Sequence, residues 1–124
     1  MKKVELIIGG NTMTIFEKSN IYIFDFNDII GIFCEHPYVS IETVHKKSKL
    51  IFHSLKEIEE LLPFPFIACN QSSIINIKHI IQVINENSKS FLLLKNGKKI
   101  CVPRRKKNDI MEKIRNSIKE SFTI

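Results

Sequence analysis

The feature that most constrains the fold is a long succession of short β-branched and aromatic runs, each of which ends at turn-forming residues. Runs of this kind, bounded by Gly, Asn, Asp or Pro, are typical of β-strands. Asn96-Gly97 is the clearest turn signal, because a type I′ hairpin turn needs positive φ at both central residues. The predicted strands cover residues 4–8, 12–16, 21–24, 29–33, 38–44, 50–53, 66–69, 74–77, 80–85, 90–95 and 98–102. The sequence therefore predicts a mainly β fold with short helices.

One short helix is predicted after the first half of these strands. Ser54 stands at the N-cap position and Glu57 at the third helical position, where each side chain can accept a hydrogen bond from the other residue's backbone N–H. Pro63 and Pro65 prevent the helix from continuing. We therefore predict a capped helix over about 54–62. Its predicted apolar face consists of Leu55, Ile58, Leu61 and Leu62.

A second helix is predicted near the C-terminal end of the sequence, over about 108–121. Asn108 is a suitable N-cap residue. The predicted apolar stripe consists of Ile110, Met111, Ile114, Ile118 and Phe122. Such a stripe packs either on a sheet of its own domain or on a second copy of the chain, and the sequence leaves both alternatives open.

The composition is that of an ordinary globular protein. The chain has 124 residues, of which 44% are hydrophobic and 26% charged, which excludes a disordered tail and suffices for one core. We therefore expect a single domain over 1–124. No apolar run approaches the roughly 20 residues of a membrane span, and no export signal is evident at the N-terminus. We expect a cytoplasmic protein with no membrane partner.

The sequence shows no motif for catalysis or for metal binding. Cys34, Cys69 and Cys101 are odd in number and lack CxxC spacing, so we expect three semi-buried free thiols in a reducing compartment. The four histidines show no HExxH pattern, and there is no phosphate-binding Gly-rich loop or activated-nucleophile motif. We expect no enzyme, no metal, no cofactor and no small-molecule substrate.

Positive charge is concentrated in one part of the sequence. The chain has 19 Lys and Arg against 13 Asp and Glu, a net charge of +6. Seven of the cations fall in a run without any acid, namely Lys95, Lys98, Lys99, Arg104, Arg105, Lys106 and Lys107. A block of one sign in a small basic domain is typical of a polyanion-binding protein. The charge favours nucleic acid over an anionic membrane surface or an acidic protein, and the lack of aromatic residues in the run disfavours single strands.

The order of these elements resembles the LytTR family of DNA-binding domains. The matching pieces are Asp28-Ile29-Ile30 with Tyr38-Val39, the helix motif Ser54–Leu62, the segment Phe66–Ser73, Ile75-Asn76 with Ile80, Lys95-Asn96-Gly97, and Val102-Pro103-Arg104-Arg105. The resemblance covers about 21–114 and leaves 1–20 as extra N-terminal strands. It implies an elongated stack of small antiparallel sheets that contacts DNA through loops.

The resemblance also implies a function. Three segments carry DNA contacts in the family, and here they fall at 35–38, 70–73 and 104–105. The resemblance implies a sequence-specific transcription regulator that reads the major grooves of double-stranded DNA, with a second copy on an adjacent half-site. The predicted DNA-binding residues are Arg104, Arg105, Lys106, Lys107, Gln71, Asn70, Ser72, His36, Tyr38 and Lys99.

The chemistry of these residues supports different contacts. Arg104 can bind guanine O6 and N7 or a phosphate, whereas Gln71 and Asn70 can pair with an adenine edge. Asn70 and Gln71 both have a capping or turn role as their alternative, and Tyr38 has a packed position beside an exposed histidine as its alternative. Asn76 is predicted to hold a turn through its amide, and Lys99 has a solubilising role as its alternative.

The middle segment departs from the family pattern. Ala68, Asn70 and Gln71 stand where the family usually has Arg, His and Arg, and Pro103 stands where Ser is common. Fewer cations mean a weaker hold on phosphates. An alternative function therefore stays open, in which the chain is a degenerate interaction module that pairs with other regulators and does not read DNA.

Overall fold

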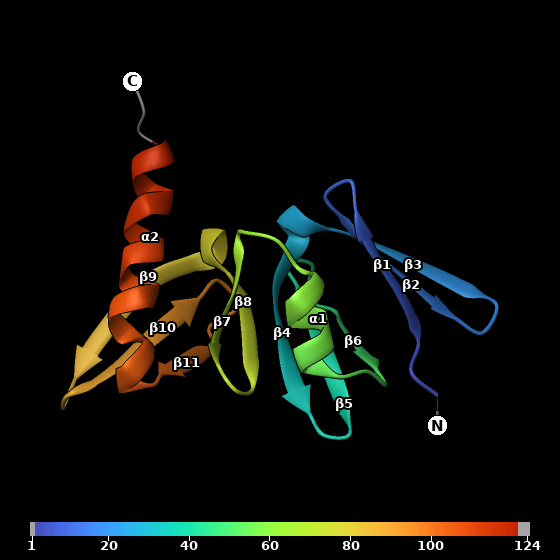
Figure 1. Cartoon of the computed structure of the whole chain (residues 1–124), viewed down its shortest axis with the longest axis horizontal. Coiled ribbons are helices and arrows are strands. Elements are labelled where there is room, and N and C mark those ends of the chain that lie inside the picture. The colour runs from blue at the N-terminus through green and yellow to red at the C-terminus, as the bar shows by residue number, and fades with distance from the viewer. Residues whose placement is uncertain (1, 122–124) are drawn as a thin grey trace.

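A computed structural model describes residues 2–121, which form three antiparallel sheets arranged in succession along the long axis of the molecule (Figure 1). The first sheet has the order β1-β2-β3, with β1 (Glu5–Gly9), β2 (Thr12–Glu17) and β3 (Asn20–Asp25). The central sheet has the order β6-β5-β4-β8-β7, with β4 (Ile29–Glu35), β5 (Tyr38–Thr43), β6 (Ser48–Ile51), β7 (Phe66–Asn70) and β8 (Ser73–Asn76). The third sheet has the order β11-β10-β9, with β9 (Ile80–Glu86), β10 (Lys89–Leu94) and β11 (Lys99–Val102). The prediction of a mainly β, elongated stack is confirmed.

Two α-helices and three 3₁₀ turns complete the described chain. They are α1 (Leu55–Leu61), α2 (Lys107–Ser121), η1 (Phe26–Asp28), η2 (Ile77–His79) and η3 (Arg104–Lys106). The turns η1 and η2 begin at Asp25 and Asn76, whose side chains accept hydrogen bonds from the backbone two residues on. The predicted role of Asn76 is confirmed, and its amide also donates to the carbonyl oxygens of Phe26 and Ile29.

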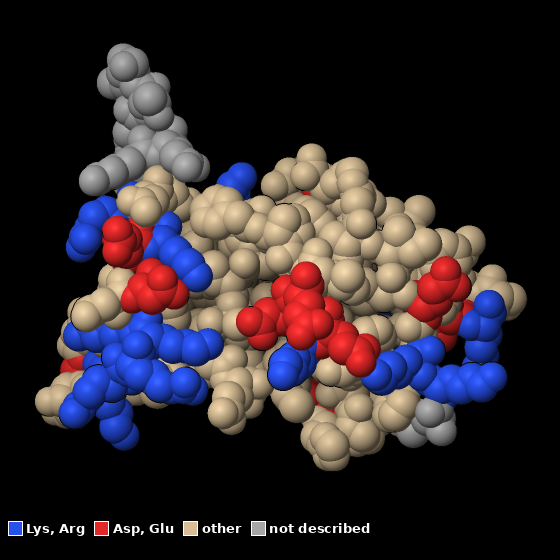
Figure 2. All heavy atoms as spheres, viewed as in Figure 1, with Lys and Arg blue, Asp and Glu red and all other residues tan. Residues whose placement is uncertain are grey.

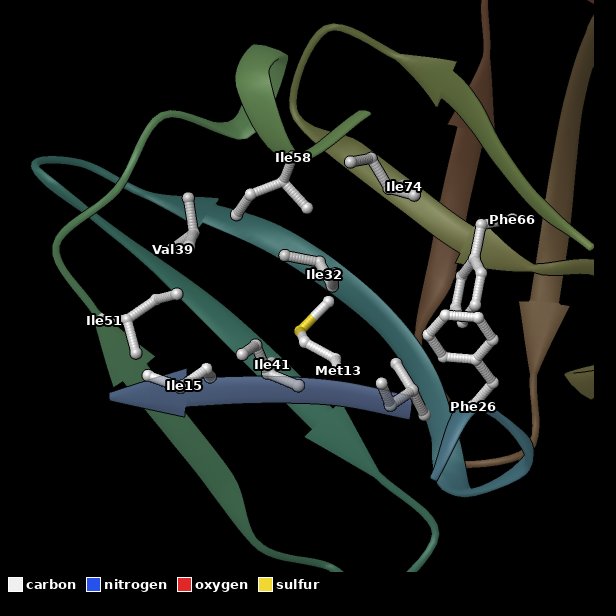
Figure 3. Packing of buried hydrophobic residues seen from close by; sticks show 11 residues of the cluster. Met13, Ile15, Phe26, Ile32, Val39, Ile41, Ile51, Ile58, Phe66 and Ile74 are labelled. Atoms are coloured by element: carbon white, nitrogen blue, oxygen red, sulfur yellow. The ribbon is translucent and has the colours of Figure 1, made fainter. Parts of the chain in front are cut away.

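The first core lies between the N-terminal sheet and the central sheet (Figure 3). Met13 and Ile15 of β2 point toward Ile32 and Ile41 of the central sheet, and all four side chains are fully buried. Ile58 closes the same core from α1. Because alternate residues of a strand face opposite sides, this packing determines which side chains of β1, β2 and β3 face the core.

The second core lies between the central sheet, the third sheet and α2. Leu92 and Leu94 of β10 are fully buried there, with Cys69 and Ile75 of the central sheet and Ile110 of α2. Of the two alternatives for the C-terminal stripe, the structure shows packing on the chain's own sheet for Ile110, Met111 and Ile114. Ile118 is 53% exposed, and Phe122 lies outside the described residues.

Two details of the helix predictions are wrong. Leu61 is 51% exposed although it was expected on the apolar face of α1. At about 100° per residue, Leu55 and Leu62 lie on one side of the buried Ile58, whereas Leu61 lies about 60° to the other side. Asn108 does not cap α2, because η3 passes directly into a helix that begins at Lys107.

The cysteines differ from the expectation of three semi-buried thiols. All three are free, but Cys34 and Cys101 are exposed and only Cys69 is buried. Cys34 lies at the exposed end of β4, and Cys101 alternates with the buried Ile100 and Val102 on β11. Burial raises the pKa of the Cys69 thiol to about 12, so this side chain behaves as an apolar core group.

In the part of the chain that is described, no helix has the length and apolar character to cross a membrane.

Candidate nucleic-acid interface

The structure brings the three predicted contact segments to one edge of the molecule. The β4–β5 turn, the β7–β8 turn and the end of β11 all lie along the lower edge in Figure 1. Two hydrogen bonds connect them: the Cys34 N–H donates to the Ser72 carbonyl oxygen at 2.9 Å, and the Asn70 amide donates to the Cys101 carbonyl oxygen at 2.8 Å. The three segments therefore form one continuous edge, although 30 or more residues of sequence separate them. This edge, formed by the β4–β5 turn, the β7–β8 turn and the end of β11, is called the loop edge.

The β4–β5 turn presents one of its two predicted contact residues. His36 is exposed and precedes Pro37 through a cis peptide bond. Tyr38 is half-buried, and its ring lies edge-on to the ring of Phe52, with 6.2 Å between the centroids. The arrangement is a packed tyrosine beside an accessible imidazole, so His36 is the better placed of the two to reach a ligand.

The β7–β8 turn separates the roles of two neighbouring amides. Asn70 uses both ends of its side chain inside the protein, since its oxygen also accepts a hydrogen bond from the Ser72 N–H at 2.8 Å. Gln71 and Ser72 are exposed at the tip. Gln71 is thus the amide of this turn that projects to solvent, whereas Asn70 holds the turn against β11.

The end of β11 presents three cations that make no ion pair with any described residue. Pro103 ends the strand and begins η3, and Arg104, Arg105 and Lys107 are exposed in this turn and at the start of α2. Lys106 differs, because its ammonium donates to the Ala68 carbonyl oxygen at 3.2 Å and is half-buried against β7. Figure 2 shows Lys and Arg gathered over this end of the molecule.

The basic run of the sequence does not form one strip in space. The Lys98 ammonium is 2.8 Å from Glu42 and lies 3.9 Å from the centroid of the Phe33 ring. Lys99 pairs with Glu86 at 2.7 Å and covers the ring of Phe91 on the outer face of the third sheet. Lys98 and Lys99 are therefore neutralised by acids of β5 and β9, and the exposed cations at the loop edge that have no described acidic partner come from the second half of the run.

Sequence reasoning missed one cation at this edge. Lys89 is exposed and directly follows the two-residue turn Asn87-Ser88 that joins β9 to β10. Ser90 pairs with Val102 in the ladder between β10 and β11, so this turn lies beside Arg104. The turn signal was visible in the sequence, but the pairing that places Lys89 near Arg104 was not.

One buried histidine lies away from the edge. The His79 Nε2 is 2.6 Å from the Asn27 carbonyl oxygen, and its buried Nδ1 has no hydrogen-bond partner among the described residues. Burial lowers the pKa of this imidazole, with a smaller lowering from Lys95.

Within the described residues, no three His, Cys, Asp or Glu side chains lie close enough together to hold a metal ion.

Comparisons with known proteins identify the family and the fold of the chain. The sequence model of a family described as "LytTr DNA-binding domain" matches residues 19–115. A solved structure described as the LytTr DNA-binding domain of a putative methyl-accepting/DNA response regulator from Bacillus cereus has the same fold, with a TM-score of 0.70 and 21% sequence identity. The match covers 86% of this chain and 98% of that one. No curated protein matches the chain.

Proposed function

We infer the function from the family of the chain, which belongs to the LytTr DNA-binding domain family, a family of DNA-binding transcription regulators. We propose that it binds specific sequences of double-stranded DNA through the loop edge. The observation that carries the proposal is the convergence of the β4–β5 turn, the β7–β8 turn and the end of β11 on one edge, with exposed cations that no described acid neutralises.

The proposed reading mode follows from what each segment presents. The three segments follow one another along the long axis (Figure 1), so a duplex lying along that axis would meet them at successive grooves. Gln71 can pair with an adenine edge, and Arg104 can bind a guanine edge or a phosphate. Arg105 and Lys107 would bind phosphates and set the register, which carries no sequence information by itself.

Selection of bound duplexes from a random pool tests this proposal. The expected result is a motif, present twice, with half-sites about 10–10.5 base pairs apart if two copies bind one face of the duplex. A single enriched motif would support specificity and contradict the paired arrangement. Recovery of random sequences would contradict sequence-specific recognition.

Substitution of Arg104 tests the role of the edge. Arg104→Ala is expected to weaken binding to the selected duplex by about 1–3 kcal/mol and to relax the preference at one base pair, as measured by fluorescence anisotropy. Lys47→Ala is the matched control, since Lys47 is exposed between β5 and β6, at the opposite end of β5 from the loop edge. Equal affinity of Arg104→Ala and wild type would contradict the assignment.

A second function has one observation in its favour. Because the Asn70 side chain is occupied by hydrogen bonds within the protein and the Ala68 side chain is apolar, the middle turn presents Gln71 and Ser72 and contributes no cation of its own. A module that pairs with other regulators and does not read DNA would show weak binding to every duplex, with little dependence on salt. The anisotropy titration at two salt concentrations separates this function from DNA recognition.

A further inference from the structure

The β9–β10 turn and the end of β11 enclose a small hollow at the outer end of the loop edge. Three cations from three elements line it: Lys89 of β10, Arg104 of η3 and Lys107 of α2. The other lining residues include Ser88 and Pro103, and none of the lining residues is acidic. Three like charges around one hollow repel one another, so an anion held between them would relieve that repulsion.

The acid that could have neutralised Lys89 is already engaged. Glu86 faces Lys89 across the β9–β10 ladder, but its carboxylate pairs with Lys99 at 2.7 Å. No described acid pairs with Lys89, Arg104 or Lys107, whereas Lys98, Lys99 and Lys113 all have partners at 3.1 Å or less. The charge of the hollow is therefore available to a ligand from outside.

The backbone holds these cations in position. Asn87 and Ser88 have φ values of 50° and 64°, the left-handed pair that makes a two-residue hairpin turn tight. The Ser90 hydroxyl donates to the Asn85 side-chain oxygen at 2.7 Å, and Ser90 pairs with Val102. The turn that carries Lys89 is thus fastened to the strand that leads into Arg104.

We infer that this hollow, formed where Lys89 meets Arg104 and Lys107, binds a backbone phosphate of the DNA at the outer end of the interface. The inference rests on the proposed function and adds a fourth contact segment, the β9–β10 turn, to the three that the family resemblance implies. A contact at this place would fix the register of the duplex along the edge and would leave base preference unchanged.

The first test uses Lys89→Ala and Lys89→Arg, with Lys47→Ala as the control on the far edge. Binding of the selected duplex is measured by anisotropy over a range of salt concentrations. We expect Lys89→Ala to bind several-fold more weakly, with the slope of log K against log salt reduced by about one and with the same sequence preference. Lys89→Arg should keep the wild-type slope. Wild-type affinity and slope for Lys89→Ala would overturn the inference.

The second test identifies the phosphate. Single phosphates of the selected duplex are replaced by uncharged methylphosphonates, and each duplex is titrated with wild type and Lys89→Ala. Replacement of one phosphate near an end of the footprint should weaken the binding of wild type but not that of Lys89→Ala. If every replacement weakens both proteins equally, Lys89 contacts no phosphate.

A third measurement separates DNA from a free anion. Inorganic phosphate is titrated at constant ionic strength while the amide NMR signals of residues 87–90 and 104–107 are followed. We expect the changes in these NMR signals not to saturate at phosphate concentrations below the millimolar range. Saturation at lower concentration would assign the hollow to a free anion and overturn the DNA contact. Failure of the proposed function would look different, since wild type itself would then show no salt-dependent duplex binding.

Discussion

At the residue scale, Asn70 and Gln71 are neighbours of similar chemistry with different roles. The Asn70 amide bonds to Cys101 and Ser72, so it joins the β7–β8 turn to β11. The Gln71 side chain is exposed at the tip. In a turn the direction of each side chain depends on backbone dihedrals and nearby strands, so one residue can stabilise the fold while the next one faces the ligand.

This difference leads to opposite expectations for two substitutions. Asn70→Ala should lower the free energy of unfolding by about 1–2 kcal/mol, because two hydrogen bonds are lost. Gln71→Ala should leave stability within about 0.5 kcal/mol of wild type but weaken binding to the selected duplex roughly tenfold. Urea denaturation and anisotropy measure the two quantities. A stable Gln71→Ala variant with wild-type affinity would remove Gln71 from the interface.

At the scale of elements, the two 3₁₀ turns η1 and η2 connect the central sheet to its neighbours. His79 at the end of η2 reaches back to the Asn27 carbonyl oxygen of η1, and Asn76 bonds to Phe26 and Ile29. These contacts fasten the junction from which the central and third sheets diverge. Burial lowers the pKa of the His79 imidazole, so the neutral form of the ring is favoured at this junction.

The histidine at this junction makes stability depend on pH. Because the folded-state pKa of His79 is below the ordinary value of 6.5, the unfolded chain takes up a proton first as pH falls. The free energy of unfolding should therefore decrease as pH falls below about 6.5 and level off below the folded-state pKa. Urea denaturation at several pH values measures this decrease. His79→Gln should flatten this decrease. An unchanged profile in His79→Gln would contradict the role of His79.

At the scale of the whole molecule, the net charge of +6 is divided between separate regions. Cations gather at the end formed by β11 and the start of α2, whereas a group of acids lies over the middle of the molecule (Figure 2). The exposed acids Glu57, Glu59 and Glu60 of α1 belong to this middle region, and Glu57 pairs with Lys3 at 2.6 Å. The cations at the β11 end therefore favour the approach of a polyanion to that end over the acidic middle region.

The number of available cations sets the expected salt dependence. If the hollow lined by Lys89, Arg104 and Lys107 binds one phosphate and Arg105 binds a second, log K should fall with log salt with a slope of about −2 per bound copy. Anisotropy titrations with the selected duplex between about 50 and 200 mM salt measure this slope. A slope near zero would contradict a phosphate-based interface of this size.

Most of the local structure of this protein follows from short-range signals in the sequence. The β-branched runs, the Ser54 cap and the Asn96-Gly97 turn act between residues close in the chain, so they predicted most strands and the position of α1 to within a few residues. The middle turn could be singled out as a candidate only through the resemblance of the element order to a family, whereas Arg104 also stood out as part of the basic run. Whether Gln71 and Arg104 contact DNA stays a prediction.

Which charged and polar side chains are available to a ligand depends on how the strands and helices pack in three dimensions. Lys98, Lys99 and Lys106 belong to the same basic run as Arg104, yet each binds a group that is distant in sequence: Glu42, Glu86 and the Ala68 carbonyl oxygen. Lys89 joins Arg104 and Lys107 only through the pairing of β10 with β11. Electrostatic and hydrogen-bonding contacts act over a few ångströms in space regardless of separation along the chain, so they become visible only once the strands are paired.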